Sequence, residues 1–316
     1  MVFESVDKVA SFTAAETVPV KLFLHEGVAQ LRPVHVNWFP TNHCNLNCDF
    51  CSCAARDKSL EMPLDRAVEV MADFRRLGCE AVTISGGGEP LCHPHLVDMI
   101  REFSRLGIEV GLVTNGLLLD SLPLDVLGLL TWCRISHADT RRLSGEYRRV
   151  LDRATEVPID WAFSHVVGKT PNLPQIRRVV KYANEHDFTH VRLVGNLMEP
   201  EAVPFGSVHE AICDIDDLVI YQPRKRHVQS TSCLVGYVKP MVAADFKMYL
   251  CCGVQYALEP MSLNLPEALC MGSATDLDAV YGNPQPIGVK CARCYYDNYN
   301  QVLRAMTSQV KHREFV

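Results

Sequence analysis

Three cysteines near the start of the chain have the spacing of an iron–sulfur site. Cys44, Cys48 and Cys51 follow the pattern C-x3-C-x2-C within the stretch TNHCNLNCDFCSC. Three thiolates from one short loop can bind three irons of a cubane cluster and leave the fourth iron without a protein ligand. That open iron can bind a small molecule, so the spacing predicts a catalytic metal site. Cys53 follows closely, and we expect it to remain a free thiol because a C-x-C pair would strain the loop.

Zinc is the alternative metal for such a loop. Structural zinc sites use paired C-x2-C units whose four ligands complete a tetrahedron. A single C-x3-C-x2-C segment does not supply those four ligands, so its spacing favours the cluster.

A second group of cysteines lies near the C-terminal end. Cys233, Cys251, Cys291 and Cys294 are separated by seventeen, thirty-nine and two residues, and the last pair forms a C-x2-C knuckle. Four thiols can complete the ligand shell of a second 4Fe–4S cluster, with structural zinc as the alternative. Cys252 adjoins Cys251, and neighbours in a strand point to opposite faces, so we interpret Cys252 as a thiol of the core. Scattered cysteines elsewhere are expected to be small buried hydrophobic residues: Cys79, Cys92, Cys133, Cys213 and Cys270.

The rest of the composition is ordinary for a globular protein. Of the 316 residues, 48% are hydrophobic and 22% are charged. The net charge of −6 argues against a large nucleic-acid interface, and we interpret the basic patch at 224–227 as a solvated turn. The first residues lack a secretory signal, and no apolar run reaches the ~18 residues of a membrane span. We therefore expect a cytoplasmic protein whose reduced thiols serve metal binding or catalysis rather than disulfides.

The elements that must position these cysteines alternate along the chain. Strand-like β-branched runs and helix-like amphipathic runs follow one another about six times. The expected strands are 34–40, 81–85, 109–116, 133–139, 160–167 and 190–195, and the expected helices are 64–78, 95–107, 141–153 and 173–186. Such alternation favours a parallel sheet with helices outside it, either a partial barrel or an open doubly wound sheet.

The alternation ends near residue 195. Residues 241–253 have the pattern of a β-hairpin with a turn at 245–247 and with Cys251 on the return strand, and a helix is expected after the cysteine knuckle. We therefore divide the chain into an N-terminal extension at 1–33, a sheet domain at 34–220 and a small cysteine-bearing module at 221–316.

A glycine cluster follows the second expected strand. Gly86, Gly87 and Gly88 tolerate positive φ and allow close approach to the backbone. Glu89 comes directly after them and offers a carboxylate acceptor to an ammonium group. The carboxyl ends of the strands form the active face of a barrel-like sheet, so this stretch should meet the cysteine loop there.

The cysteine loop after the first strand and the stretch SGGGEP after the second together resemble the radical SAM superfamily. The resemblance implies an α/β fold with a partial (β/α)6 TIM-like barrel, a 4Fe–4S cluster on Cys44, Cys48 and Cys51, and S-adenosylmethionine on the open iron. It also implies cofactor contacts from a set of residues in the cysteine loop and at the strand ends: Phe50, Gly86, Gly87, Gly88, Glu89, Asn115 and Ser136.

The C-terminal cysteines resemble the auxiliary twitch or SPASM-like module of some radical SAM enzymes, such as those of the 2-deoxy-scyllo-inosamine dehydrogenase type. This resemblance implies a second 4Fe–4S cluster, held by Cys233, Cys251, Cys291 and Cys294. Under this resemblance Cys252 is either a core thiol or a hydrogen-atom donor of the kind found in radical SAM epimerases.

The resemblance implies an enzyme that cleaves S-adenosylmethionine reductively and uses the 5′-deoxyadenosyl radical to abstract a hydrogen from its substrate. An external one-electron reductant is then required. We expect a polar small-molecule substrate, a sugar, cyclitol or nucleoside, that is dehydrogenated or epimerised. The alternative is a maturase that crosslinks or epimerises a ribosomally made precursor peptide. Polar residues near strand ends form a pool of candidate acids and bases: His137, Asp139, His165, Lys169 and Arg192.

Overall fold

The computed structural model describes residues 30–138, 143–196, 198, 203–222, 230–258, 264–292, 294 and 296–307. Within these residues the main element is a ten-stranded sheet with the strand order β11-β10-β9-β1-β2-β3-β4-β5-β6-β7. Most of the predicted N-terminal extension, the basic patch at 224–227 and Asp139 lie outside the described residues.

Strands β1 to β7 form a parallel array in which each strand pairs with the one before it in the chain. Their bounds are β1 His35–Trp38, β2 Ala81–Ile84, β3 Glu109–Thr114, β4 Leu130–Ala138, β5 Asp160–Val167, β6 His190–Gly195 and β7 Val219–Gln222. The helices between them are α3 Leu64–Arg76, α4 Leu96–Arg105, α5 Leu124–Leu127, α6 Gly145–Ala154, α7 Leu173–Glu185 and α8 Phe205–Ile212. Parallel neighbours need such crossover connections, which explains the alternation in the sequence.

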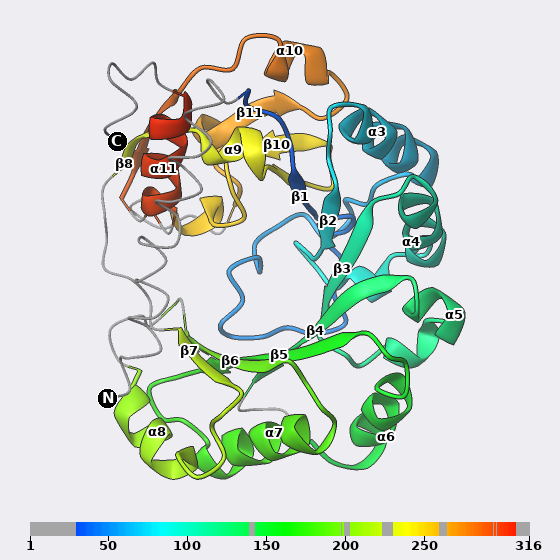
Figure 1. The fold of residues 1–316 in the computed structure, drawn as a ribbon, viewed down its shortest axis with the longest axis vertical. Helices are drawn as coiled ribbons and strands as arrows, with labels where there is room; N and C mark the ends of the chain where they lie inside the picture. The colour runs from blue at the N-terminus through cyan, green and yellow to red at the C-terminus, as the bar shows by residue number, and fades with distance from the viewer. Residues whose placement is uncertain are drawn as a thin grey trace.

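The sheet is curved, with these helices on its outer side and the loop between β1 and α3 inside the curve (Figure 1). The prediction of an α/β fold with a partial TIM-like barrel and a cysteine-rich C-terminal part is confirmed. Two predicted boundaries were wrong. β4 begins at Leu130 instead of residue 133, and α6 begins at Gly145 instead of residue 141.

The hydrophobic core lies between the sheet and the outer helices. In α4 the buried side chains Leu96, Met99, Ile100 and Phe103 recur at the spacing of one helix face. The Trp38 ring of β1 packs edge-on against Phe103, with ring centroids 5.7 Å apart. Because apolar side chains are gathered on the outer side, the inner face of the sheet is left for polar residues.

The C-terminal part of the chain extends the same sheet beyond β1. β9 pairs parallel with β1 and antiparallel with β10, and β10 pairs antiparallel with β11. The bounds are β9 Met241–Val242, β10 Lys247–Tyr249 and β11 Cys270–Ser273. The predicted hairpin is therefore present, and it is hydrogen-bonded directly to the barrel.

Cys251 does not lie on the return strand of this hairpin. A register shift between Met248 and Tyr249 marks the end of regular pairing, and both Cys251 and Cys252 follow β10 in a loop. The argument that these two neighbours point to opposite faces of a strand is therefore wrong.

A two-stranded sheet, β8 Ser230–Cys233 with β12 Ile287–Cys291, lies beside the C-terminal hairpin. The helices of this part are α9 Val235–Val238, α10 Leu277–Tyr281 and α11 Asp297–Thr307, with the 3₁₀ helices η3 Val254–Tyr256 and η4 Glu267–Leu269. The predicted helix after the cysteine knuckle corresponds to α11. In the described part of the chain no helix combines the length and the apolar character needed to cross a membrane.

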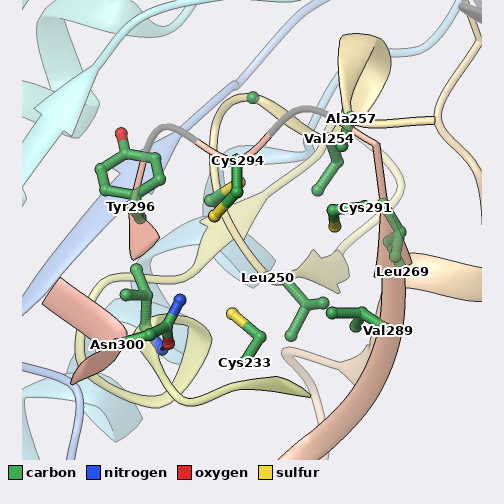
Figure 2. Close-up of a pocket in the computed structure, with 13 residues that line it drawn as sticks. Cys233, Leu250, Val254, Ala257, Leu269, Val289, Cys291, Cys294, Tyr296 and Asn300 are labelled. Atoms are coloured by element: carbon green, nitrogen blue, oxygen red, sulfur yellow. Dashed lines mark hydrogen bonds between the residues drawn. The ribbon is translucent and has the colours of Figure 1, made fainter. Parts of the chain in front are cut away.

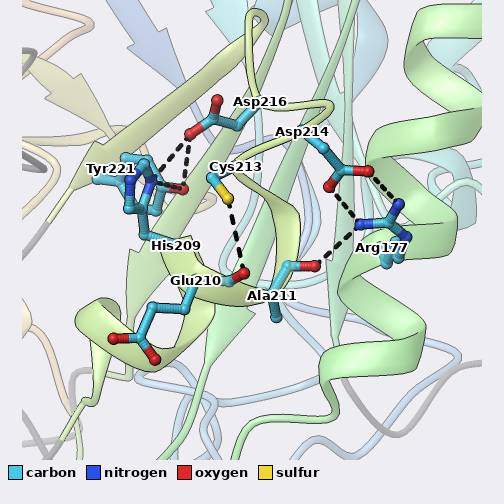
Figure 3. Close-up of polar contacts among 8 residues, drawn as sticks. All are labelled: Arg177, His209, Glu210, Ala211, Cys213, Asp214, Asp216 and Tyr221. Carbon is cyan, nitrogen blue, oxygen red and sulfur yellow. Dashed lines mark hydrogen bonds and ion pairs between the residues drawn. The ribbon is translucent and has the colours of Figure 1, made fainter.

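Polar contacts hold α8 between α7 and β7 at the far edge of the barrel (Figure 3). Arg177 on α7 forms an ion pair with Asp214, which follows α8. His209 on α8 and Tyr221 on β7 both hydrogen-bond to the carboxylate of Asp216, at 3.0 and 3.2 Å. These contacts fix α8 and β7, the last helix and strand of the parallel array. None of them involves a residue of the cysteine loop.

Gly111 on β3 leaves room for an indole ring on the inner face of the sheet. A Cβ at Gly111 would lie 2.1 Å from Cε2 of Trp132, well inside van der Waals contact. Gly168 offers a matched comparison, because a Cβ there would meet no described atom within 4 Å.

We expect Gly111→Ala to lower the free energy of unfolding by about 1–3 kcal/mol, because either the strand or the Trp132 ring must move. Gly168→Ala should change that free energy by less than about 0.5 kcal/mol. Urea denaturation followed by tryptophan fluorescence measures both variants. Equal stability of the two would show that the indole ring moves aside at no cost.

Candidate functional site

The cysteine loop runs from the end of β1 to the start of α3, inside the curve of the sheet (Figure 1). Cys44, Cys48 and Cys51 are half-buried. The N–H of Cys51 donates to the carbonyl of Cys48 at 3.1 Å, and the N–H of Leu46 donates to Cys44 Sγ at 3.4 Å. These local bonds fold the loop so that all three thiols stay partly accessible.

The glycine stretch packs against this loop through backbone contacts. The N–H of Gly88 donates to the carbonyl of Thr41 at 2.9 Å, and the N–H of Glu89 donates to the carbonyl of His43 at 2.8 Å. A Cβ at Gly88 would lie 1.9 Å from the carbonyl oxygen of His43. The lack of a side chain at Gly88 therefore allows the glycine stretch to contact the cysteine loop. The cofactor contacts of the three glycines stay a prediction.

The carboxylate of Glu89 links the strand ends to each other. It is buried and accepts hydrogen bonds from Thr114 Oγ1 at 2.6 Å and from the N–H of Asn115 at 2.7 Å. Asn115 in turn donates from Nδ2 to Asn45 Oδ1 of the cysteine loop at 2.7 Å. Glu89 thus holds the site together. A contact between Glu89 and an ammonium group stays a prediction. It is possible because a carboxylate has lone pairs beyond those that accept these hydrogen bonds.

Ser136 and Phe50 are the remaining predicted cofactor contacts. Ser136 lies on β4 in one row with Ser164 on β5 and Arg192 on β6. Phe50 is half-buried in the cysteine loop. The contact of Ser136 and Phe50 with a cofactor stays a prediction.

The side chain of Cys53 favours a thiolate at Cys51. Cys53 is 8% exposed, and its thiol donates to the Gly86 carbonyl oxygen at 3.8 Å. The interaction with the Cys53 side chain lowers the pKa of Cys51 to about 6, with Lys58 and Arg56 acting in the same direction and burial opposing them. The same interaction raises the pKa of Cys53. Thiolate is the form that binds metal, so Cys51 is suited to be a ligand near neutral pH.

Arg56 ties the cysteine loop to the C-terminal half, and the sequence analysis missed it. Its side chain is buried, lies 5.4 Å from the centroid of the Phe39 ring and donates to Gln255 Oε1 at 2.9 Å. Gln255 on η3 donates from Nε2 to Ser52 Oγ at 3.1 Å. No sequence pattern could reveal this contact, because Arg56 and Gln255 are 199 residues apart.

The four C-terminal cysteines line one pocket (Figure 2). Cys233 ends β8, Cys251 follows β10, Cys291 ends β12 and Cys294 precedes α11. Apolar side chains form much of the remaining wall: Val235, Leu250, Val254, Ala257, Leu269 and Val289. Asn300 on α11 accepts hydrogen bonds from two backbone N–H groups just after Cys233 and so fixes one side of the pocket.

Burial and mutual repulsion disfavour thiolates in this pocket. Burial raises the pKa of Cys233 and, well above its ordinary range, that of Cys251. The pKa of Cys291 rises to about 11, first through burial and then through the nearby thiols of Cys294 and Cys233. A bound metal centre would supply the positive charge that stabilises thiolates here.

A second cluster and a single zinc ion stay the two predicted alternatives for these donors. In the described part of the chain, no three His, Cys, Asp or Glu side chains lie close enough together to hold one metal ion. Thiolates around one zinc ion lie about 4 Å apart, given a Zn–S bond of about 2.3 Å. Thiolates around a cubane lie farther apart because the cluster occupies the space between them.

Cys252 lies beside the pocket, with its Sγ 3.2 Å from the hydroxyl oxygen of Tyr296. Its interpretations as a core thiol or as a hydrogen donor both stay open. Among the scattered cysteines, Cys79 and Cys133 are buried as predicted, and Cys92 and Cys270 are half-buried. The prediction for Cys213 is wrong: it is exposed at the end of α8, 3.7 Å from the Glu210 carbonyl (Figure 3).

Two members of the acid–base pool lie away from the inner face. His137 and His165 are buried with their Nδ1 atoms 3.1 Å apart, and His137 stacks on Tyr147 of α6. Their rings therefore pack on the helix side of the sheet. Arg192, by contrast, is in the same row as Ser136, and Lys169 lies in the loop after β5.

Comparison with known proteins places this site in a family. Residues 38–138 match the model of the radical SAM superfamily. A probable GTP 3′,8-cyclase of Archaeoglobus fulgidus is 35% identical over 240 residues, which cover 66% of this chain and 78% of that protein. The PqqA peptide cyclase of Gluconobacter oxydans is 31% identical over 162 residues, 46% of this chain and 44% of that protein.

A solved structure has the same fold. Streptococcus suis SuiB bound to the precursor peptide SuiA superposes with a TM-score of 0.57 at 14% identity, over 75% of this chain and 63% of that one. For three of the curated relatives that it matches, the chain spans 23%, 44% and 22% of their length. Because the match to the Archaeoglobus protein covers most of that protein at 35% identity, the chain belongs to the radical SAM superfamily.

Proposed function

We propose that this chain is a radical SAM enzyme that binds a 4Fe–4S cluster through Cys44, Cys48 and Cys51. The observation that carries the proposal is the packing of the cysteine loop on the glycine stretch at the carboxyl ends of β1 to β3. When bound, the cluster and S-adenosylmethionine supply a one-electron cleavage of a carbon–sulfur bond and a 5′-deoxyadenosyl radical. An external one-electron reductant provides the electron.

The residues of the chain have the task of binding and positioning. Glu89 fixes the ends of β2 and β3 and, through Asn115, the cysteine loop. We propose that the free backbone groups of the glycine stretch, together with Phe50 and Ser136, hold the cofactor on the inner face. Such positioning makes the reaction between cofactor and substrate effectively intramolecular.

We further propose that Cys233, Cys251, Cys291 and Cys294 hold a second 4Fe–4S cluster. The pocket that they line supports this, because its apolar wall keeps water away and its four thiols complete a ligand shell. The division of the chain into a barrel at 34–220 and an auxiliary module at 221–316 is part of the proposal. The reduced thiols that both clusters require suit a cytoplasmic location.

The proposed substrate is a polar small molecule of the sugar, cyclitol or nucleoside kind, which is oxidised or epimerised. The Archaeoglobus fulgidus relative, of which this chain covers 78%, carries the name of a probable GTP 3′,8-cyclase, and this name supports the nucleoside class. A second candidate function is the maturation of a precursor peptide. The similarity to a PqqA peptide cyclase favours it, although that match covers less than half of either chain.

The first test is anaerobic reconstitution of the full chain with iron and sulfide. We expect about eight irons per chain, four for each cubane, and release of 5′-deoxyadenosine after reduction with dithionite. Cys44→Ala should bind about four irons and release none of this product, because the open cluster is lost. Cys213→Ala removes an exposed thiol and is the matched control. Product release by Cys44→Ala at the rate of the control would refute the proposed function.

The second test concerns the C-terminal pocket alone. Cys291→Ala should also bind about four irons, yet it should still release 5′-deoxyadenosine, since the front cluster remains. Metal analysis and product release measured on the same sample separate the two clusters. Zinc in place of iron in the Cys44→Ala variant would contradict the second cluster.

A further inference from the structure

A buried amide belongs to the wall of the pocket that the four C-terminal cysteines line. Asn300 lies in the first turn of α11, lines this pocket and is 1% exposed (Figure 2). Asparagine is a poor residue for a helix because its amide competes with the backbone for hydrogen bonds. Burying an amide is also costly unless its polar atoms are paired. The position of Asn300 therefore needs a reason at both Oδ1 and Nδ2.

The oxygen of this amide has two partners. Oδ1 accepts from the N–H of Leu234 at 2.7 Å and from the N–H of Val235 at 3.1 Å. These donors lie at the start of α9, where the first N–H groups of a helix have no partner within it. Two donors at one atom also settle the orientation of the amide, since a flipped amide would place Nδ2 against them. Oδ1 thus holds the residues directly after Cys233 against α11.

The nitrogen of the same amide has no such role. Nδ2 of Asn300 is shielded from solvent and forms no hydrogen bond with any residue that the structure describes. It carries two N–H groups, and neither is needed at the start of α9. A carboxylate would serve that start at least as well, because side-chain oxygens and negative charge are both favoured there. The amide nitrogen is therefore what asparagine adds at this position.

Among the described residues, the wall of this pocket offers few side-chain acceptors other than sulfur. The apolar side chains named above form much of it. Tyr296 also lines the pocket, and its hydroxyl oxygen lies 3.2 Å from Sγ of Cys252. A buried water needs about two to four polar partners, which an apolar wall does not supply. The cysteine sulfurs are thus the acceptors that suit Nδ2.

Sulfur accepts hydrogen bonds best when the cysteines bind metal, because the thiolate is the form that binds. Hydrogen bonds to the sulfurs are among the factors that set the reduction potential of an iron–sulfur cluster. Cys233 is the cysteine next to Asn300 in this respect, since Oδ1 binds the N–H of the residue that follows it. A buried donor without a partner among the described residues therefore fits a metal centre on these cysteines.

We propose that Asn300 donates a hydrogen bond from Nδ2 to a sulfur atom of the second cluster beside Cys233 and so raises the reduction potential of that cluster. The inference rests on the second cluster of the proposed function. A donor draws negative charge away from sulfur, so it stabilises the reduced cluster, which holds one more electron. Asn300 then positions Cys233 through Oδ1 and tunes the cluster through Nδ2.

The first test detects the hydrogen bond itself in the full chain carrying Cys44→Ala, in which the C-terminal cluster is the one expected to form. The chain is labelled with nitrogen-15 at the side-chain nitrogen of asparagine, reconstituted anaerobically and reduced with dithionite. HYSCORE spectroscopy should show a nitrogen-15 coupling, because the hydrogen bond places spin density on Nδ2. Asn300→Asp should abolish it. Asn184→Asp is the matched control and should keep it, since Asn184 is exposed on α7 and donates to the Ile215 carbonyl.

The second test measures the reduction potential of the same cluster by redox titration followed by EPR. Asn300→Asp and Asn300→Leu should both shift the reduction equilibrium toward the oxidised cluster about tenfold or more, which is about 59 mV for one electron. Leucine brings no charge, so a fall in both variants is due to the lost donor. Asn184→Asp should leave the potential unchanged. About four irons per variant chain show that the pocket still binds a cluster.

The outcomes separate this inference from the proposed function. If the labelled chain binds about four irons and shows no nitrogen-15 coupling, the inference is wrong while the second cluster stands. That result does not depend on whether a variant folds, because the labelled chain keeps Asn300. A lower potential in Asn300→Asp with an unchanged potential in Asn300→Leu would assign the effect to charge and overturn the inference as well. Zinc in place of iron would refute the second cluster and the inference with it.

Discussion

Two backbone hydrogen bonds between the cysteine loop and the glycine stretch support the rest of the site. The carbonyls of Thr41 and His43 accept from the N–H groups of Gly88 and Glu89, at 2.9 and 2.8 Å. This contact needs a residue without a side chain, because a Cβ at Gly88 would lie only 1.9 Å from the His43 carbonyl oxygen. Once the two loops are joined, the Glu89 carboxylate reaches the end of β3. A loop that carries three thiols is thereby held by the ends of three parallel strands.

The C-terminal half completes this arrangement from the other side. β9 continues the sheet beyond β1, so the segments that carry the second cysteine group start from a fixed edge of the barrel. The Arg56–Gln255 hydrogen bond then connects the front loop to η3, which directly follows Cys251 and Cys252. Buried polar contacts of this kind specify one arrangement because leaving either partner unpaired is costly. The two thiol groups are therefore parts of one hydrogen-bonded structure.

The distribution of charge differs between the surface and the interior. The chain as a whole carries a net charge of −6, yet Arg134 and Arg192 both lie on the inner face of the sheet. Net charge describes the long-range field and solubility, whereas a ligand inside the sheet responds to the few groups near it. In the pocket of C-terminal thiols, burial raises the pKa of Cys251 and of Cys291 and so disfavours their charged form. The charge on the inner face of the sheet and in the C-terminal pocket is therefore set by the neighbouring residues and not by the overall composition.

The sequence by itself determined the family, the alternation of strands and helices, and the residues of the front loop. Cys44, Cys48 and Cys51 are neighbours along the chain, so their spacing carries their geometry, and amphipathic periodicity marks each helix. Only the tertiary structure decided that Gly88 contacts His43, that Arg56 reaches Gln255, and that Arg134 and Arg192 share the inner face of the sheet. Such contacts join residues far apart in the sequence, and they depend on strand register. Shifting a register by one residue would turn Arg134 toward the helices, and no local pattern records that choice.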